Sequence, residues 1–195
     1  MVILLAINTA SKESAIALIE SGIVLGEDSW GAAANETEKL LPNLQALLQK
    51  GKKKWQDLEG IFVTKGPGAY TSLRVGIAVA NSAAWVLKLP MFSADVFEVW
   101  EKRLTLDRQI APHAIVVDIG RGNYRLTGDT HSYSLEELID LGKPCYGELP
   151  DDFKTKAEVD FSFGQGVANF DFWKLSKEKM IQPLYSNPPN ITLKK

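Results

Sequence analysis

The sequence predicts an α/β protein made of two lobes, and three observations support this. Short apolar runs typical of buried strands alternate with helical patterns over the first half of the chain. A strand, a glycine loop and a long helix then follow one another without a gap. After the polar stretch 105–112 a second strand-rich unit begins. We therefore expect a first lobe over residues 1–105 and a second, reduced lobe over residues 106–195.

The chain opens with three predicted strands. Residues 2–7 form a continuous apolar run, which is typical of a strand buried on both faces. Residues 14–19 and 23–30 are two further strand-like runs, and they are joined at Ser21 and Gly22, where glycine can supply the positive φ of a tight hairpin.

A leucine repeat predicts the first helix. Leucines at positions 40, 41, 44, 47 and 48 recur at helical spacing, with Asn35 or Thr37 as N-cap and Gly51 as the stop. Pro42 lies inside this pattern and predicts a kink or a loosened turn, because it removes one backbone hydrogen bond.

Residues 60–64 are predicted as a strand, 65–68 as a tight loop, and 71–87 as a helix capped by Thr71 or Ser72. Another helix is expected over 93–104. In the second lobe we expect strands at 114–118 and 124–127 around a glycine turn, a short helix opened by a Ser134–Glu137 capping box, and a strand at 159–163.

Composition sets limits on function. The 195 residues are 45% hydrophobic, and 22 Lys and Arg against 24 Asp and Glu give a net charge of -2, so no global field draws the chain onto nucleic acid. The single cysteine cannot form an internal disulfide. The first residues lack the features of a signal peptide, and no apolar run approaches the roughly 18 residues of a membrane span. We expect a cytoplasmic protein without membrane contact.

The sharpest motif is GPGAYTSLRVGIAVANSAAW, residues 66–85. A glycine loop before a helix directs backbone N–H groups at a ligand such as phosphate, with Gly66, Gly68 and Thr71 as the candidate residues and Asn8 at the end of the first strand. The alternative is a crossover whose glycines only permit close packing, and the absence of a Walker lysine pattern leaves both interpretations open.

The other residues with reactive side chains give little indication of a catalytic or metal-binding site. Asp118 precedes a glycine turn and is interpreted as a turn former. His113 and His131 are the only histidines, and their spacing in sequence fits no helical metal motif. Cys145 is interpreted as a buried thiol. The lysine run at positions 50 and 52–54, beside Trp55, is a weak candidate for RNA contact.

Taken together, the segments resemble the TsaB (YeaZ) family over nearly the whole chain. ILLAINTASKESAIALIESG resembles a strand that ends in D-T-A or D-T-S, and NETEKLLPNLQALLQKG resembles a helix of H-S-E-x-L-L-P type. GPGAYTSLRVGIAVA resembles the signature G-P-G-S-F/Y-T-G-L/V-R-I/V-G. AIVVDIGRGNYRL and IQPLYSNPPNITLKK resemble the family's second-lobe strand and its ending.

The resemblance implies the two-lobed fold of actin, Hsp70 and sugar kinases (ASKHA), with a shortened second lobe. It also implies a non-catalytic role in making N6-threonylcarbamoyladenosine (t6A) on tRNA, as a pseudoenzyme that binds and activates its catalytic paralogue TsaD alongside the ATPase TsaE. Without TsaD, a homodimer is expected, and tRNA would be contacted mainly through the complex. No cofactor is required, although weak ATP or ADP binding at the lobe or partner interface is retained as an expectation.

The family's partner helices correspond to the leucine helix and the small-residue helix of this chain. The expected interface residues are the leucines of the first helix and small or apolar residues of the second: Leu40, Leu44, Leu47, Leu48, Ser72, Gly76, Val79, Ala80 and Ala83. Asn8 and Ser72 replace an Asp and a Gly of the family pattern, which implies a degraded nucleotide cleft. The alternatives are a small-molecule kinase or ATPase of the same fold with Asp118 as base, and, ranked last, a peptidase.

Overall fold

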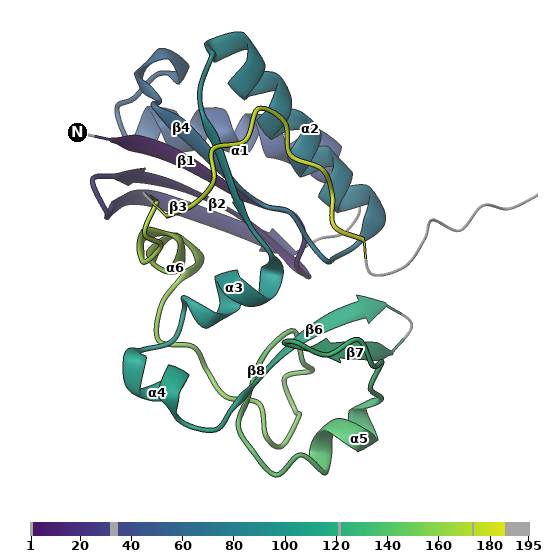
Figure 1. Ribbon diagram of the computed structural model, residues 1–195. Coiled ribbons are helices and arrows are strands. Elements are labelled where there is room, and N and C mark those ends of the chain that lie inside the picture. Colours follow the sequence, from purple (N-terminus) through teal and green to yellow (C-terminus); the bar gives the residue numbers. More distant parts are fainter. Residues whose placement is uncertain (1, 32–34, 121, 173, 186–195) are drawn as a thin grey trace, which may run out of the picture.

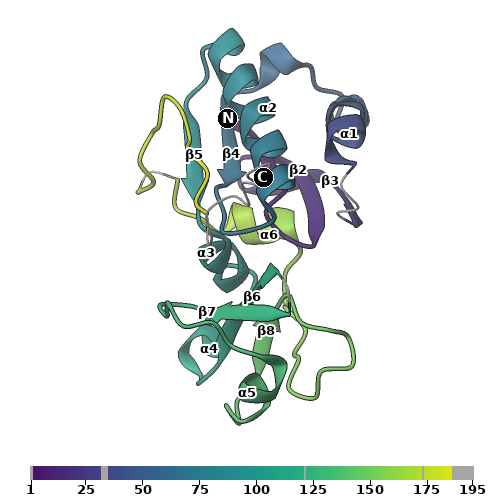
Figure 2. The same ribbon diagram turned by 90° about the vertical axis from the view of Figure 1, so that its right-hand side faces the viewer.

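The two lobes lie one above the other in Figure 2. The computed structural model describes residues 2–31, 35–120, 122–172 and 174–185. The first lobe holds a five-stranded sheet in the order β3-β2-β1-β4-β5, and the second a three-stranded sheet in the order β7-β6-β8. Within the described ranges, no helix is both long and apolar enough to cross a membrane.

The three opening strands are confirmed as an antiparallel meander. They are β1 (Ile3–Asn8), β2 (Glu13–Glu20) and β3 (Ile23–Gly31). The β2–β3 hairpin turns at the predicted pair, where Ser21 has φ of 51° and Gly22 has φ of 82°. Both values lie in the left-handed region, which glycine adopts at little cost.

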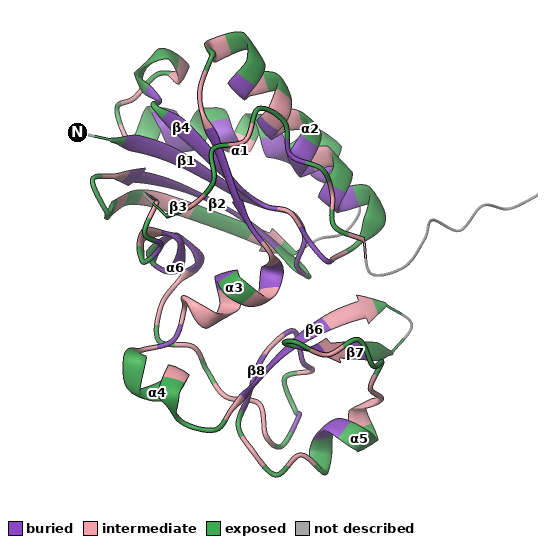
Figure 3. Cartoon of the chain, viewed as in Figure 1, coloured by how far each residue is buried: buried purple, intermediate pink, exposed green. Residues whose placement is uncertain are grey.

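Strand β1 is the centre of the lobe because both of its faces are covered. Its residues alternate between two cores, since successive side chains of a strand point to opposite faces. Ile3, Leu5 and Ile7 pack with α1 (Glu36–Lys50) and α2 (Tyr70–Leu87). Leu4 and Ala6 pack with the elements on the other face, α3 (Val96–Glu101) and α6 (Phe163–Ala168). Figure 3 shows this burial along the sheet.

The two long helices match the sequence prediction with small changes. Helix α1 has Asn35 at its N-cap and runs unbroken through Pro42. Helix α2 is capped by Ala69, which makes no side-chain hydrogen bond, so the predicted caps Thr71 and Ser72 are wrong. The helix begins directly from the glycine loop, two or three residues earlier than a hydroxyl cap at Thr71 or Ser72 would place it.

Two parallel strands extend the sheet beside β1. Strand β4 (Gly60–Thr64) was predicted, and it follows a short 3-10 helix, η1 (Trp55–Asp57). Strand β5 (Met91–Ala94) was missed, because it has only four residues and its last two fall in the segment predicted as one helix over 93–104. Helix α3 begins after Asp95, whose carboxylate accepts a hydrogen bond from the Glu98 N–H.

The second lobe contains α4 (Leu106–Ile110), β6 (Ala114–Gly120), β7 (Asn123–Leu126), α5 (Leu135–Ile139) and β8 (Cys145–Gly147). The glycine turn between β6 and β7 and the Ser134–Glu137 capping box are confirmed. Strand β8 pairs parallel to β6 and was not predicted, because three residues carry too short a pattern.

The predicted strand at 159–163 is wrong. Ser162 instead caps α6, where its hydroxyl accepts a hydrogen bond from the Gln165 N–H. Gly164 lets the helix approach the first sheet, since a Cβ there would lie 2.8 Å from the Ala17 methyl. The sequence Ser-x-x-Gln is a capping box, and it outweighs the apolar residues that suggested a strand.

The chain then returns along the first lobe. Ile181 is buried with α1 and α2, and Glu178 bridges Met91 at the edge of β5. Figure 1 shows this yellow segment crossing α2. The assignment of residues 106–195 to the second lobe is therefore wrong for 163–172 and 174–185, which complete both cores of the first lobe.

Candidate functional site

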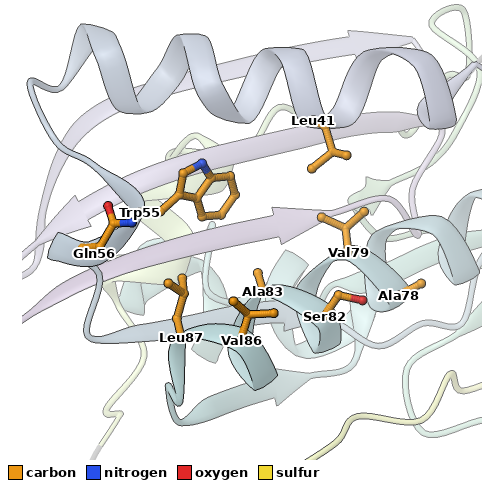
Figure 4. A pocket seen from close by; sticks show the side chains of 9 residues that line it. All are labelled: Leu41, Trp55, Gln56, Ala78, Val79, Ser82, Ala83, Val86 and Leu87. Atoms are coloured by element: carbon orange, nitrogen blue, oxygen red, sulfur yellow. The ribbon is translucent and has the colours of Figure 1, made fainter.

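An apolar groove of about 550 Å³ lies between α1, α2 and η1. Figure 4 shows Leu41 pointing from α1 toward α2, with Trp55 and Gln56 at the other end. The groove is lined mainly by apolar side chains, and Gln56 and Ser82 are its polar members: Leu41, Trp55, Gln56, Ala78, Val79, Ser82, Ala83, Val86 and Leu87.

The groove exposes large side chains that an isolated domain would normally bury. Leu41 is 52% exposed and Val86 is 68% exposed, and the neighbouring Trp85 is 83% exposed. Exposed apolar groups gathered in a groove mark a surface suited to another protein.

Most of the predicted interface residues do not lie on this surface. Seven of them are buried in the first lobe, where they hold the helices onto the sheet: Leu40, Leu44, Leu47, Leu48, Ser72, Gly76 and Ala80. They are corrected to core residues. Only Val79 and Ala83 of the predicted set line the groove.

The sequence does contain a signal for the surface that was missed. On α2 the buried residues 73, 76, 77, 80 and 84 form one stripe, and residues 78, 79, 82, 83 and 86 form a second stripe beside it. A helix that only covers a sheet needs one apolar stripe. The second stripe, together with Leu41 next to Leu40, could have indicated a further contact face.

The glycine loop is filled by the protein's own backbone. A Cβ at Gly68 would clash with the backbone of Ala10, and one at Gly66 would clash with the carbonyl of Leu184. The Leu184 N–H donates to the Lys65 carbonyl oxygen at 2.6 Å. These contacts favour the close-packing interpretation of the loop, whose glycines admit the β1–β2 turn and the returning chain.

Asn8 is part of the same arrangement. Its Oδ1 accepts a hydrogen bond from the Ala10 N–H at 3.0 Å, and its Nδ2 donates to Ser11 Oγ at 3.1 Å. The amide therefore organises the turn that packs against Gly68. Thr71 is exposed on the first turn of α2.

Asp118 fulfils the predicted role of turn former. One of its carboxylate oxygens accepts a hydrogen bond from the Gly120 N–H at 2.6 Å, and the other pairs with Lys12 Nζ at 2.7 Å. The ammonium partner comes from the first lobe, and sequence reasoning did not find it.

The remaining reactive side chains lie in separate surroundings. His113 contacts Glu101 at 2.9 Å, and His131 lies 3.9 Å from Glu137. Cys145 is buried, and burial raises the pKa of its thiol. Over residues 2–31, 35–120, 122–172 and 174–185, no three His, Cys, Asp or Glu side chains gather as a metal site.

In the predicted lysine run, Lys53 is engaged with Glu20 at 2.6 Å. The RNA contact suggested for that run stays a prediction.

Solved structures define the class of fold. YeaZ from Pseudomonas aeruginosa superposes with a TM-score of 0.69 at 18% identity, over 95% of this chain and 100% of that one. The two lobes with their two sheets are thus an actin-like ASKHA fold, as the sequence resemblance implied.

Sequence relatives are more specific. The chain is 34% identical over 95 residues to the tRNA threonylcarbamoyladenosine biosynthesis protein TsaB of Bacillus subtilis, and this covers 49% of the chain and 42% of that protein. It is 27% identical to the TsaB of Buchnera aphidicola over 93% of the chain and 88% of that protein. A family model described as TsaD, tRNA N6-adenosine threonylcarbamoyltransferase, matches residues 30–158. The chain therefore belongs to the family that this model describes, and within it the chain is similar to TsaB proteins.

Proposed function

We propose that this protein is the non-catalytic subunit of the complex that makes N6-threonylcarbamoyladenosine on tRNA, and that it binds and activates TsaD. The observation that carries the proposal is the apolar groove between α1 and α2. The names of the sequence relatives support the pathway, and the groove supplies a surface on which a partner's apolar side chains would be buried.

The packing of the glycine loop supports a non-catalytic role. A phosphate held by such a loop needs open space in front of the backbone N–H groups. In this chain Ala10 and Leu184 occupy the approaches to Gly68 and Gly66. Asn8 adds no negative charge to the turn, because its amide is neutral and is engaged with Ala10 and Ser11.

The test is co-purification with TsaD from the same genome, followed by an assay for t6A formation with and without this chain. Leu41→Asp and Val86→Asp should each lower TsaD binding by at least tenfold, because both place a charge in the groove. Both side chains are more than half exposed, so the variants should remain folded.

Leu106→Asp is the matched control. Leu106 is 70% exposed on α4 and lies outside the groove, so this variant should bind TsaD normally. Equal binding by all three variants would contradict the groove as the interface.

Further features belong to the proposal. TsaE would join the complex, and tRNA would be contacted mainly through the complex. In the absence of TsaD, the groove would bind a second copy of the chain, so Val86→Asp should also convert a homodimer to a monomer in analytical ultracentrifugation. ATP or ADP would bind weakly, at the lobe or partner interface, and no cofactor would be required. The complex would work in the cytoplasm.

A further inference from the structure

The lobes meet at a small polar cluster that lies apart from the groove. Lys12, in the β1–β2 turn of the first lobe, pairs with Asp118 on β6 at 2.7 Å. The same ammonium group lies 5.9 Å from the ring centre of Tyr124 on β7. This ion pair adds to an apolar contact between the lobes, in which Phe97 and Trp100 of α3 pack with Ile115 of β6 and Tyr146 of β8.

Glu148 lies next to this ion pair and directly follows β8. It is 5% exposed, and its Oε2 accepts a hydrogen bond from the Asp118 N–H at 3.1 Å. Its Oε1 is buried and has no hydrogen-bond partner. An ionised carboxylate with an unpaired buried oxygen is costly, whereas the protonated acid is tolerated.

Burial and the neighbouring polar groups determine the pKa of Glu148. Burial is the largest effect and raises its pKa from 4.5 to about 7; the Asp118 carboxylate raises it too, whereas the nearby Ser11 hydroxyl, the hydrogen bond from the Asp118 N–H and the Lys12 charge lower it. With Glu148 protonated, Lys12 and Asp118 balance each other. With Glu148 ionised, the cluster has one uncompensated negative charge.

We propose that Lys12, Asp118 and Glu148 form a latch between the two lobes, which is closed while Glu148 is protonated and opens when Glu148 ionises. Ionisation releases the proton to solvent, and the carboxylate then gains hydration only if the turn at residues 10–12 separates from β6. This polar part of the interlobe contact is therefore sensitive to pH close to neutrality, whereas the apolar contact of α3 with β6 and β8 stays in place.

Hydrogen exchange of two amides tests the latch. The Asp118 N–H donates to Glu148, and the Ala10 N–H lies in the facing turn, where it donates to Asn8. If Glu148 titrates at about 7 when closed and at 4.5 when open, the protection of both amides should fall about tenfold between pH 6 and pH 8. Both should also be less protected than the buried β4 residue Val63, because the latch opens without global unfolding.

Variants distinguish opening of the latch from a general loss of amide protection across the protein. Glu148→Gln keeps the side-chain shape and cannot ionise, so the change in protection between pH 6 and pH 8 should vanish. Lys12→Met removes the ion pair and should lower protection at every pH, whereas Lys174→Met, which breaks an exposed pair with Asp171, should leave both amides unchanged.

Three results would overturn the proposal. The first is the same pH change in Glu148→Gln, and the second is faster exchange at Asp118 without any change at Ala10. The third needs no variant: in the unmodified protein, carbon-13 NMR of the Glu148 carboxyl should show a midpoint near pH 7, and a midpoint near 4.5 would exclude the latch.

Discussion

Leu40 and Leu41 are neighbours in sequence, yet one is 1% exposed and the other 52% exposed. The spacing of the leucines predicts an apolar helix face, but it does not say whether the sheet or a partner protein covers each leucine. On α1 the sheet covers Leu40, Leu44 and Leu47, which belong to one core cluster, and leaves Leu41 for the groove.

This assignment predicts opposite results for two similar substitutions. Leu44→Asp should destabilise the protein on the order of 4 kcal/mol, because it buries a charge at a site with 0% exposure. Leu41→Asp should change stability by less than about 1 kcal/mol. Urea unfolding followed by circular dichroism measures both, and equal stabilities would place Leu44 outside the core.

Gly68 allows a second prediction at the residue scale. Gly68→Ala should cost about 2 kcal/mol, because the new methyl would meet the Ala10 backbone, which cannot rotate away. Gly31→Ala is the control, since nothing lies within 4 Å of a Cβ there. A Gly68→Ala protein as stable as this control would show that the loop has room for a ligand.

At the scale of elements, the returning segment 178–185 acts as a strap across the first lobe. Asn81 of α2 holds it by two hydrogen bonds: its Nδ2 donates to the Ile181 carbonyl at 3.0 Å, and its Oδ1 accepts from the Ile181 N–H at 2.9 Å. Tyr185 stacks on Tyr70 at 4.9 Å, which fixes the strap to the start of α2.

Ile181→Ala should therefore destabilise the first lobe by about 3 kcal/mol, because Ile181 is 1% exposed and its loss leaves a cavity. Met180→Ala, at a neighbouring side chain that is 60% exposed, should have an effect within about 0.5 kcal/mol. Thermal unfolding distinguishes the two, and a neutral Ile181→Ala would mean that the strap adds little to the core.

The elements also show what could be predicted from the sequence. The β1–β3 meander and helices α1 and α2 were predictable, because each has a long run of one period or a glycine at its turn. Strands β5 and β8, of four and three residues, are too short to show a period. The strap was not predictable, since its contacts with Asn81 and Met91 join residues far apart in sequence.

The same reasoning applies to the site. The two helices that form the groove were predicted from the sequence. The residues chosen on them were mostly those of the buried stripe, because the strongest apolar period is the one that faces the sheet. Trp55 was noticed only beside the lysine run. Its place in the groove depends on η1 lying across the end of α1 and α2, which spacing does not specify.

At the scale of the whole molecule, two groups of the described residues, Glu148 and His113, make stability fall as pH rises through the range near neutrality. Burial raises the pKa of Glu148 from 4.5 to about 7. Burial lowers the pKa of His113, but the Ala111 carbonyl and the Glu101 carboxylate outweigh this and raise it above 6.5. In both cases the folded protein holds its proton more tightly than the unfolded chain, so the free energy of unfolding decreases as pH rises.

The two groups change the stability over different pH ranges. The Glu148 contribution is complete below pH 4.5 and is lost by about pH 7, on the order of 3 kcal/mol. The His113 contribution is complete below pH 6.5 and is lost as pH rises through the folded pKa. Urea unfolding from pH 5 to pH 8 should therefore show a steady loss of stability.

Two variants show how much each group contributes to the change of the free energy of unfolding with pH. Glu148→Gln should flatten it between pH 5 and pH 7, while His113→Gln should act only above pH 6.5, because the imidazole does not titrate below that range in either state. A slope that survives both substitutions would have to come from elsewhere. The Asp129, Glu137 and Asp151 carboxylates cannot supply it, since hydrogen bonds lower their pKa and their contribution is lost at acid pH, with the opposite sign.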